Sequence, residues 1–280
     1  MGLVALSIRW SMRALCVLFL VLAGDVFPGE GQMLRIPVRE GVVVPVFWLP
    51  QESTASAPDA PATLVLLPGG NGTIGKLDES GWPASGNFLV RSGKLFAAYG
   101  FNLAMVAKPS DLVGLDPVLR GSRWHREDLH KVLAHLRQLS AAPLWLVATS
   151  QGTISAALLA IAESQSSGDS GGGLVAGVVL TSSITSNRIA NTVPRLDLDR
   201  IRVPVLVMHH AQDACFACRA DETANIVDGL TNAPVRKLLI VDGGGPPVGD
   251  PCAARHYHGY VGMEAQAVDA IAAWVGAPMP

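Results

Sequence analysis

The stretch Ala148-Thr149-Ser150-Gln151-Gly152 places a serine between small residues, just where the apolar run 144–148 gives way to helix-forming residues. A tight turn from a strand into a helix forces its central residue into a strained backbone conformation, and it needs small residues two places to either side. The hydroxyl would then project from the strand end and could act as a nucleophile. Ala148 departs from the G-x-S-x-G pattern, and a serine that merely caps the helix is the alternative interpretation.

A serine is a weak nucleophile unless a histidine takes its proton and a carboxylate orients that histidine. Asp213 follows the apolar run 203–208, and His258 lies between the next apolar run and the last predicted helix. The chain therefore holds serine, acid and histidine in that order, each on a loop that follows an apolar run. Asp242 is the alternative acid and His256 the alternative base, because the residues alone do not choose between the two histidines.

Attack by a serine on an acyl group builds negative charge on the carbonyl oxygen, which N–H donors can stabilise. We expect one donor to be the backbone N–H of Gln151, directly after the serine. The other is expected in Pro68-Gly69-Gly70-Asn71-Gly72, where an earlier apolar run ends. Gly70 is the preferred donor and Asn71 the next, while an ordinary glycine turn is the alternative interpretation.

The three cysteines in the last third of the sequence lie close, in sequence, to the predicted acid and base. We expect a disulfide between Cys215 and Cys252, which would tie the loop of Asp213 to the loop of His258; Cys218 is the alternative partner. The same cysteines with a nearby histidine also resemble a Cys3His zinc site, and a thiol-redox role for Cys215 and Cys218 is a further alternative. The disulfide is preferred, and we expect no metal.

The elements that would position these residues alternate along the chain. A hairpin is predicted over 34–49, followed by strands at 64–67, 101–107, 144–148, 174–180, 203–208 and 235–241 and helices at 88–98, 124–139, 151–162, 220–230 and 261–275. Apolar strands that alternate with helices predict an α/β fold with a mostly parallel, twisted sheet of about eight strands and helices on both faces. Functional residues of such sheets gather at the carboxyl ends of the strands.

The N-terminus has the pattern of a secretory signal peptide. Arg9 and Arg13 precede the apolar run 14–23, which is too short to span a bilayer comfortably and is followed by small residues. We expect cleavage to remove residues 1–24 and to leave one domain, 25–280, in the periplasm or outside the cell, without membrane association. An uncleaved anchor is the alternative.

Composition narrows the class of protein further. The chain has 280 residues, of which 49% are hydrophobic and 16% charged, and its net charge is −2. It can bury a large core, and it has no basic stripe that would bind nucleic acid. His125, His130 and His135 recur every five residues on one predicted helix, a spacing that spreads them around it, so we expect them in solvent. The residues leave the oligomeric state open.

The serine turn, the acid, the histidine and their order together resemble the α/β-hydrolase family over residue 34 to the C-terminus. The sequence His258-Gly259-Tyr260 is similar to that of little-characterised exported bacterial members, which favours His258 over His256. The resemblance implies a serine hydrolase that cleaves a carboxylic ester or related acyl bond of a small-molecule substrate without a cofactor. A hydrolase fold that has lost activity and only binds ligands is the alternative. Only residues 182–202 separate two strands where many relatives insert a lid, so we expect no large lid domain.

Overall fold

The computed structural model describes residues 30–51, 60–166 and 173–280. The predicted signal peptide and its cysteine, Cys16, lie outside these ranges. Eight strands form the main sheet: β1 (Gln32–Arg39), β2 (Val42–Leu49), β3 (Thr63–Leu67), β6 (Asn102–Val106), β7 (Leu144–Thr149), β8 (Val175–Thr181), β9 (Val205–His210) and β10 (Arg236–Val241).

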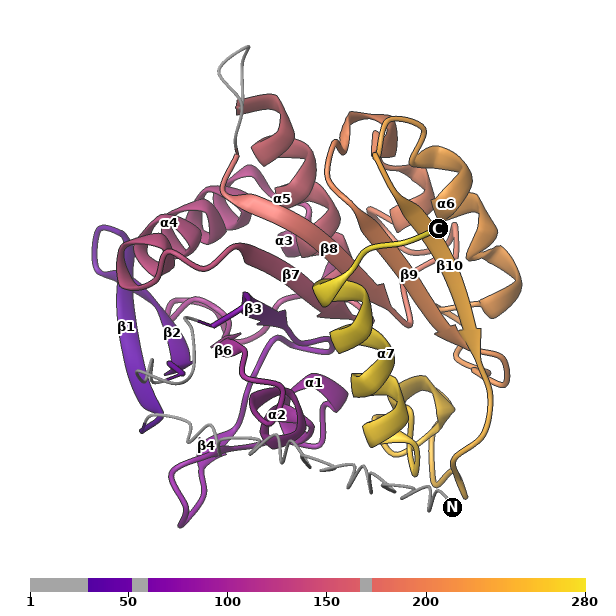
Figure 1. Cartoon of the computed structure of the whole chain (residues 1–280), viewed down its shortest axis with the longest axis horizontal. Coiled ribbons are helices and arrows are strands. Elements are labelled where there is room, and N and C mark those ends of the chain that lie inside the picture. Colours follow the sequence, from indigo (N-terminus) through magenta and orange to yellow (C-terminus); the bar gives the residue numbers. More distant parts are fainter. Residues whose placement is uncertain (1–29, 52–59, 167–172) are drawn as a thin grey trace, which may run out of the picture.

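The strand order across the sheet is β1-β2-β6-β3-β7-β8-β9-β10. The hairpin β1–β2 is antiparallel and β2 pairs antiparallel with β6, whereas all the later neighbours are parallel. Strand β1 thus forms one edge of the sheet, β3 and β7 lie at its centre, and β10 forms the other edge (Figure 1). The predicted α/β fold with a mostly parallel sheet is confirmed.

Helices cover both faces of the sheet (Figure 1). They are α1 (Phe88–Arg91), α2 (Gly93–Ala97), α3 (Pro117–Arg120), α4 (Arg123–Leu139), α5 (Gly152–Ser166), α6 (Ala224–Gly229) and α7 (Glu264–Gly276). One core cluster joins the sheet to α4, α5 and α6, and a second joins the opposite face to α1, α2 and α7.

Strand β3 illustrates why both faces are covered. Val65 and Leu67 belong to the core cluster under α4 and α5, while Leu64 and Leu66 belong to the cluster under α1 and α7. Successive side chains of a strand point to opposite faces, so a strand that is apolar at every position needs a partner layer on each side. Burying both faces leaves only the strand ends for chemistry.

Some predicted elements differ in the structure. The helix predicted over 88–98 is divided into α1 and α2 at Ser92, next to Gly93, whose added Cβ would lie 2.2 Å from Met105 Cε. This close approach to the sheet is a long-range contact that local periodicity does not contain. The small hairpin of β4 (Lys76–Leu77) and β5 (Pro83–Ala84) was not predicted, because strands of two residues carry no repeating pattern.

The segment between β8 and β9 folds into two short 3-10 helices, η1 (Val193–Arg195) and η2 (Leu198–Arg200). It packs beside α5 and α6, and Val193, Leu198 and Ile201 are buried in the first core cluster. The segment therefore covers the side of the domain and forms no lid in the described part of the chain. No helix among the described residues is both long and apolar enough to cross a bilayer.

Candidate active site

Ser150 occupies the turn between β7, which ends at Thr149, and α5, which begins at Gly152. Its φ is +53°, in the left-handed region that side-chain-bearing residues seldom adopt. Its N–H donates to the carbonyl of Thr181 at 3.0 Å, which anchors the turn to the neighbouring strand. A Cβ added at Gly152 would lie 2.1 Å from the carbonyl oxygen of Leu67, so only glycine fits there. The strained, tightly packed turn that the sequence predicted is present.

Asp213 and His258 come together from two loops. Asp213 follows β9, and His258 lies in the short 3-10 helix η4 (Tyr257–Gly259) beyond β10. Nδ1 of His258 donates to Oδ2 of Asp213 at 2.9 Å, and their side chains are 6% and 0% exposed. Since Nδ1 carries the proton in this bond, the lone pair of the neutral ring is on Nε2. The acid therefore fixes the tautomer that a general base needs.

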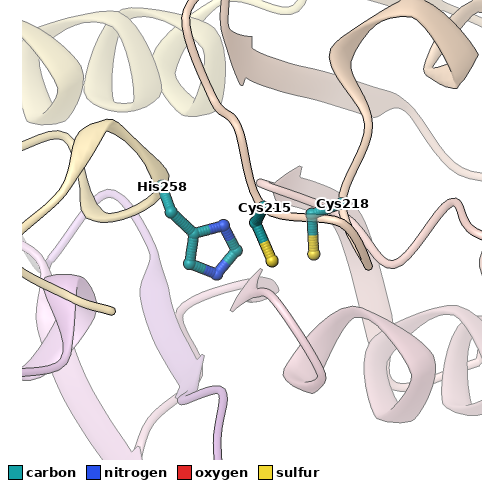
Figure 2. A group of neighbouring side chains, drawn as sticks. All are labelled: Cys215, Cys218 and His258. Atoms are coloured by element: carbon teal, nitrogen blue, oxygen red, sulfur yellow. The ribbon is translucent and has the colours of Figure 1, made fainter. Parts of the chain in front are cut away.

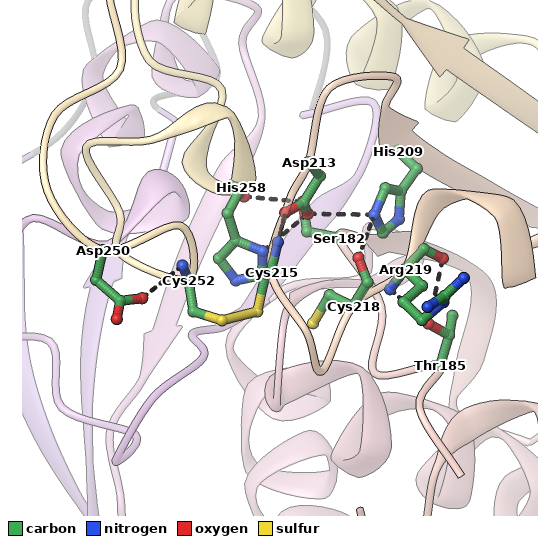
Figure 3. Close-up of a disulfide and its surroundings, with 10 residues drawn as sticks. All are labelled: Ser182, Thr185, His209, Asp213, Cys215, Cys218, Arg219, Asp250, Cys252 and His258. Carbon is green, nitrogen blue, oxygen red and sulfur yellow. Dashed lines mark hydrogen bonds and ion pairs between the residues drawn. A yellow bond between two sulfur atoms is a disulfide. The ribbon is translucent and has the colours of Figure 1, made fainter. Parts of the chain in front are cut away.

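Ser182 and Tyr260 hold the histidine-bearing segment against the sheet. The Ser182 hydroxyl donates to the backbone carbonyl of His258 at 2.8 Å, directly beyond the end of β8 (Figure 3). The hydroxyl of Tyr260, which is fully buried, donates to the carbonyl of Met208 in β9 at 3.0 Å. The sequence analysis missed both contacts, because they join residues far apart in the chain.

His209, near the end of β9, is a second histidine that contacts Asp213. Its Nε2 lies 3.1 Å from Oδ2 of Asp213 and 3.0 Å from the carbonyl oxygen of Cys218. A carbonyl oxygen only accepts, so Nε2 carries a proton that both oxygens share. Figure 3 shows Asp213 between the two rings. The sequence analysis did not identify His209, although a histidine in an otherwise apolar strand was a signal.

The surroundings of Asp213 keep it ionised. Burial by itself would raise the pKa of its carboxyl group, but hydrogen bonds from His209 and His258 and the N–H of Cys215 outweigh burial and lower the pKa to about 2. The Cys215 N–H donates to Oδ1 at 2.9 Å. Asp213 therefore carries a negative charge beside His258 throughout the neutral range.

Ser150 and His258 line one cavity of about 200 Å³, together with Gly69, Gly70, Asn71, Thr73, Ser85, Asn87, Phe88, Thr149, Cys252, Ala254 and Gly259. Among the hydrogen bonds of the described residues, none joins the Ser150 hydroxyl to the His258 ring. Such bonds often tighten only when substrate is bound.

Cys218 is a buried free thiol beside the serine. Burial raises the pKa of this thiol well above its usual value and the charge of Asp213 raises it further, although the neighbouring Ser150 hydroxyl lowers it. The thiol is therefore protonated at neutral pH. Its sulfur, the Cys215 sulfur and one ring nitrogen of His258 all lie within 4.8 Å of one another (Figure 2).

A disulfide joins Cys215 to Cys252, the pair that the sequence analysis preferred, across 37 residues of chain (Figure 3). The bridge directly links the loop of Asp213 to the loop that leads to His258. It also bears on the zinc interpretation, because a sulfur in a disulfide cannot serve as a thiolate ligand. Within the described residues, Cys218 and His258 alone do not amount to a Cys3His site, so this donor set does not fit zinc in the oxidised protein.

The backbone around Ser150 offers N–H donors for an oxyanion. Gly70 has φ of +55°, and no atom lies within 4 Å of the position where its Cβ would be. In the described part of the chain, the N–H groups of Gly69, Gly70, Asn71 and Gln151 donate to no other group. Gly70 and Asn71 line the cavity, whereas Gln151, which directly follows Ser150 and is half-buried, is not among its lining residues.

The alternative acid and base lie elsewhere. The carboxylate of Asp242 is exposed and accepts the N–H of Gly243 at 2.9 Å. The ring of His256 meets that of Tyr257 edge-on at 5.5 Å, and its buried Nδ1 has no hydrogen-bond partner in the described structure. Of these two histidines, only His258 is hydrogen-bonded to a carboxylate, that of Asp213, which follows β9.

Comparison with known proteins identifies similar folds. No family model matches the chain, and no curated protein matches it. Among solved structures, it is similar to a hyperthermophilic esterase from Pyrobaculum calidifontis (TM-score 0.62, 16% identity, 90% of this chain and 84% of that one). A dienelactone hydrolase from Anabaena variabilis gives a TM-score of 0.57 at 11% identity, over 88% and 96% of the two chains.

The chain has the α/β-hydrolase fold. A third similar structure, an α/β serine hydrolase without a lid from Xanthomonas campestris, gives a TM-score of 0.54 at 15% identity over 88% of this chain and 97% of that one. In this chain, Ser150, Asp213 and His258 lie on the segments that follow β7, β9 and β10.

Proposed function

We propose that this protein is an exported serine hydrolase that cleaves a carboxylic ester, or a related acyl bond, through an acyl-enzyme. The observation that carries the proposal is the left-handed φ of Ser150 on a cavity shared with His258, whose Nδ1 is bonded to Asp213. The names of the similar structures, esterases and serine hydrolases, support the same class of reaction.

In the proposed reaction, Nε2 of His258 takes the proton of Ser150 as Oγ attacks the carbonyl carbon. Asp213 stabilises the imidazolium that forms. The N–H groups of Gly70 and Gln151 bind the oxyanion, and the protonated His258 then gives its proton to the leaving alcohol. A water molecule, deprotonated by His258, then attacks the acyl carbon; the bond between that carbon and Oγ breaks, the acid leaves, and His258 returns the proton to Oγ of Ser150.

No cofactor enters these steps. The disulfide is compatible with an oxidising compartment, and the apolar N-terminal run supports export to the periplasm or beyond. The intact mass of exported protein tests cleavage after residue 24 directly; an exported protein that retains Met1 would contradict it.

A fluorophosphonate probe and short-chain aryl esters test the chemistry. We expect the probe to modify Ser150, and we expect Ser150→Ala and His258→Ala each to lower kcat at least about 10³-fold, because either change removes a partner in proton transfer. His256→Ala is the matched control and should keep most of the activity.

Two results would overturn the proposal. Folded wild-type protein that the probe does not label, and that hydrolyses none of the esters, would instead support a ligand-binding protein on a hydrolase fold. Full activity in the His258 variant would remove the proposed base.

A further inference from the structure

Arg120, the last residue of α3, is a cation buried beneath the glycine-rich loop 68–72, which we name the oxyanion loop. Its side chain is 2% exposed, and in the described structure no carboxylate is bonded to it. Burial lowers the pKa of its guanidinium to about 10, even though the charge of Asp116 raises it. The group is therefore positively charged at neutral pH.

Three consecutive carbonyl groups of the oxyanion loop each accept a hydrogen bond. Nη2 of Arg120 donates to the carbonyl oxygens of Pro68 and Gly70, each at 3.1 Å. The carbonyl oxygen between them, that of Gly69, accepts the N–H of Gly72 at 3.2 Å. Peptide groups are planar, so a hydrogen bond to each carbonyl also restricts the direction of the N–H in the same plane.

The oxyanion loop also packs closely against the nucleophile at Gly69. A Cβ added at Gly69 would lie 2.7 Å from Cβ of Ser150 and 3.3 Å from its Oγ. The N–H groups of Gly69, Gly70 and Asn71 are the uncommitted donors described above, and all three residues line the cavity. The carbonyls of the oxyanion loop are thus committed to Arg120 and Gly72, while the N–H groups of the three residues that line the cavity with Ser150 remain uncommitted.

Neutral groups complete the surroundings of Arg120. Its Nη1 donates to Oγ of Ser155 at 3.1 Å, and Ser155 contacts Nε2 of His125 at 2.9 Å. Burial, and secondly the charge of Arg120, lower the pKa of His125 to about 3, so this ring is neutral. The expectation that His125 lies in solvent is wrong: it is 6% exposed, because α4 turns this residue toward α5. Arg120 is therefore the cation of this network, held only by neutral acceptors.

We propose that Arg120 is a positioning residue for acyl transfer: it fixes the oxyanion loop through two carbonyls and sets a positive charge behind the developing oxyanion. The inference rests on the proposed function and deepens it. A fixed set of donors stabilises a transition state without reorganisation, and loss of a single donor typically costs about 10²–10³ in kcat. Loosening the donors should cost less than deleting one.

The test compares Arg120→Met and Arg120→Lys with wild-type protein. We expect the Met variant to lose about ten- to a hundredfold in kcat toward a short-chain aryl ester, with KM changed by less than about threefold. The inhibition constant of a boronic acid, which mimics the tetrahedral intermediate, should rise by a similar factor. The Lys variant keeps the charge and one or more donors, so it should recover part of the loss.

Arg39→Met is the matched control. The guanidinium of Arg39 likewise makes ion pairs, with Asp128 of α4 at 2.9 Å and with Asp111 at 2.9 Å. Arg39 is the last residue of β1 and does not line the cavity. We expect it to lower the melting temperature without changing kcat. A role of Arg120 in stability alone would give that same pattern.

Three outcomes would overturn the inference. A folded Arg120→Met protein with wild-type kcat and boronic acid affinity would show that the loop needs no such support. Failure of both Arg120 variants to fold would assign the residue to the fold instead of the loop. Wild-type protein without Ser150 labelling would overturn this inference together with the proposed function, whereas labelled wild-type protein and an unaffected Met variant would overturn the inference alone.

Discussion

Each side chain of the proposed triad depends on a neighbour for its chemical state. His258 keeps its proton on Nδ1 because Asp213 accepts it, and Asp213 in turn is bonded to His209. Ser150 projects from its strand because the backbone there is left-handed. Substitutions of the supporting residues should therefore change rates or pH dependence, and not only stability.

The titration of Asp213 should be visible in the stability of the fold. The pKa of the carboxyl group falls from 3.8 to about 2 on folding, so its ionised form stabilises the native state above pH 4, and that contribution is lost as the pH falls toward 2. A shift of this size corresponds to about 2 kcal/mol. We expect urea unfolding to give a difference between wild type and Asp213→Asn that is largest near pH 7 and shrinks between about pH 4 and pH 2. A difference that does not vary with pH would contradict this assignment.

Among single residues, the sequence predicted those that directly follow a strand. It missed those whose role depends on contacts with residues far away in the chain. Ser150, Asp213 and His258 each follow a predicted strand, so their proximity could be expected from the common edge of a parallel sheet. Arg120 reaches carbonyls 52 and 50 residues away, and nothing local to it indicates burial. His125 was misplaced for the same reason.

The turn from β7 into α5 is the element on which the site depends. Gly152 and Gly69 allow the helix, the oxyanion loop and the serine to approach within contact distance, as their would-be Cβ positions demonstrate. The alternation of apolar runs with helical segments was sufficient to predict these elements. Their ends were less predictable, and the break between α1 and α2 at Ser92 depends on packing against β6.

Gly152→Ala should therefore be strongly destabilising. Its new methyl group would meet the carbonyl oxygen of Leu67 at 2.1 Å, and backbone atoms on both sides leave little room to relax. We expect a loss of about 3 kcal/mol or more in the free energy of unfolding, or no folded protein. Gly276→Ala is the control, since no atom lies within 4 Å of that position and the change should stay within about 1 kcal/mol. Equal stability of the two variants in denaturant titration would refute the steric argument.

The whole domain combines a recognisable architecture with a sequence that matches no family model. This is understandable, because the fold requires apolar strands, covering helices and small residues at one turn, and many sequences satisfy these needs. The segment between β8 and β9 packs against the side of the domain, and this has a consequence for the kinetics. Because the described part of the chain places no lid over the site, we expect that no lipid surface is needed to open it.

Ester hydrolysis should therefore follow ordinary saturation kinetics. We expect the rate for a sparingly soluble ester to level off with the concentration of dissolved substrate, without an increase where an emulsion first forms. Initial rates measured across the solubility limit check this expectation, with a soluble short-chain ester as the control. A sharp increase at the limit would indicate a movable cover over the site.

The bridge between Cys215 and Cys252 closes a loop of 37 residues that includes all of β10. It can form only after both loops have been synthesised and have reached an oxidising environment. Production host should accordingly matter as much as sequence: material from a reducing cytosol would carry the same polypeptide with its acid and base segments untethered, and batches of equal purity would differ in specific activity.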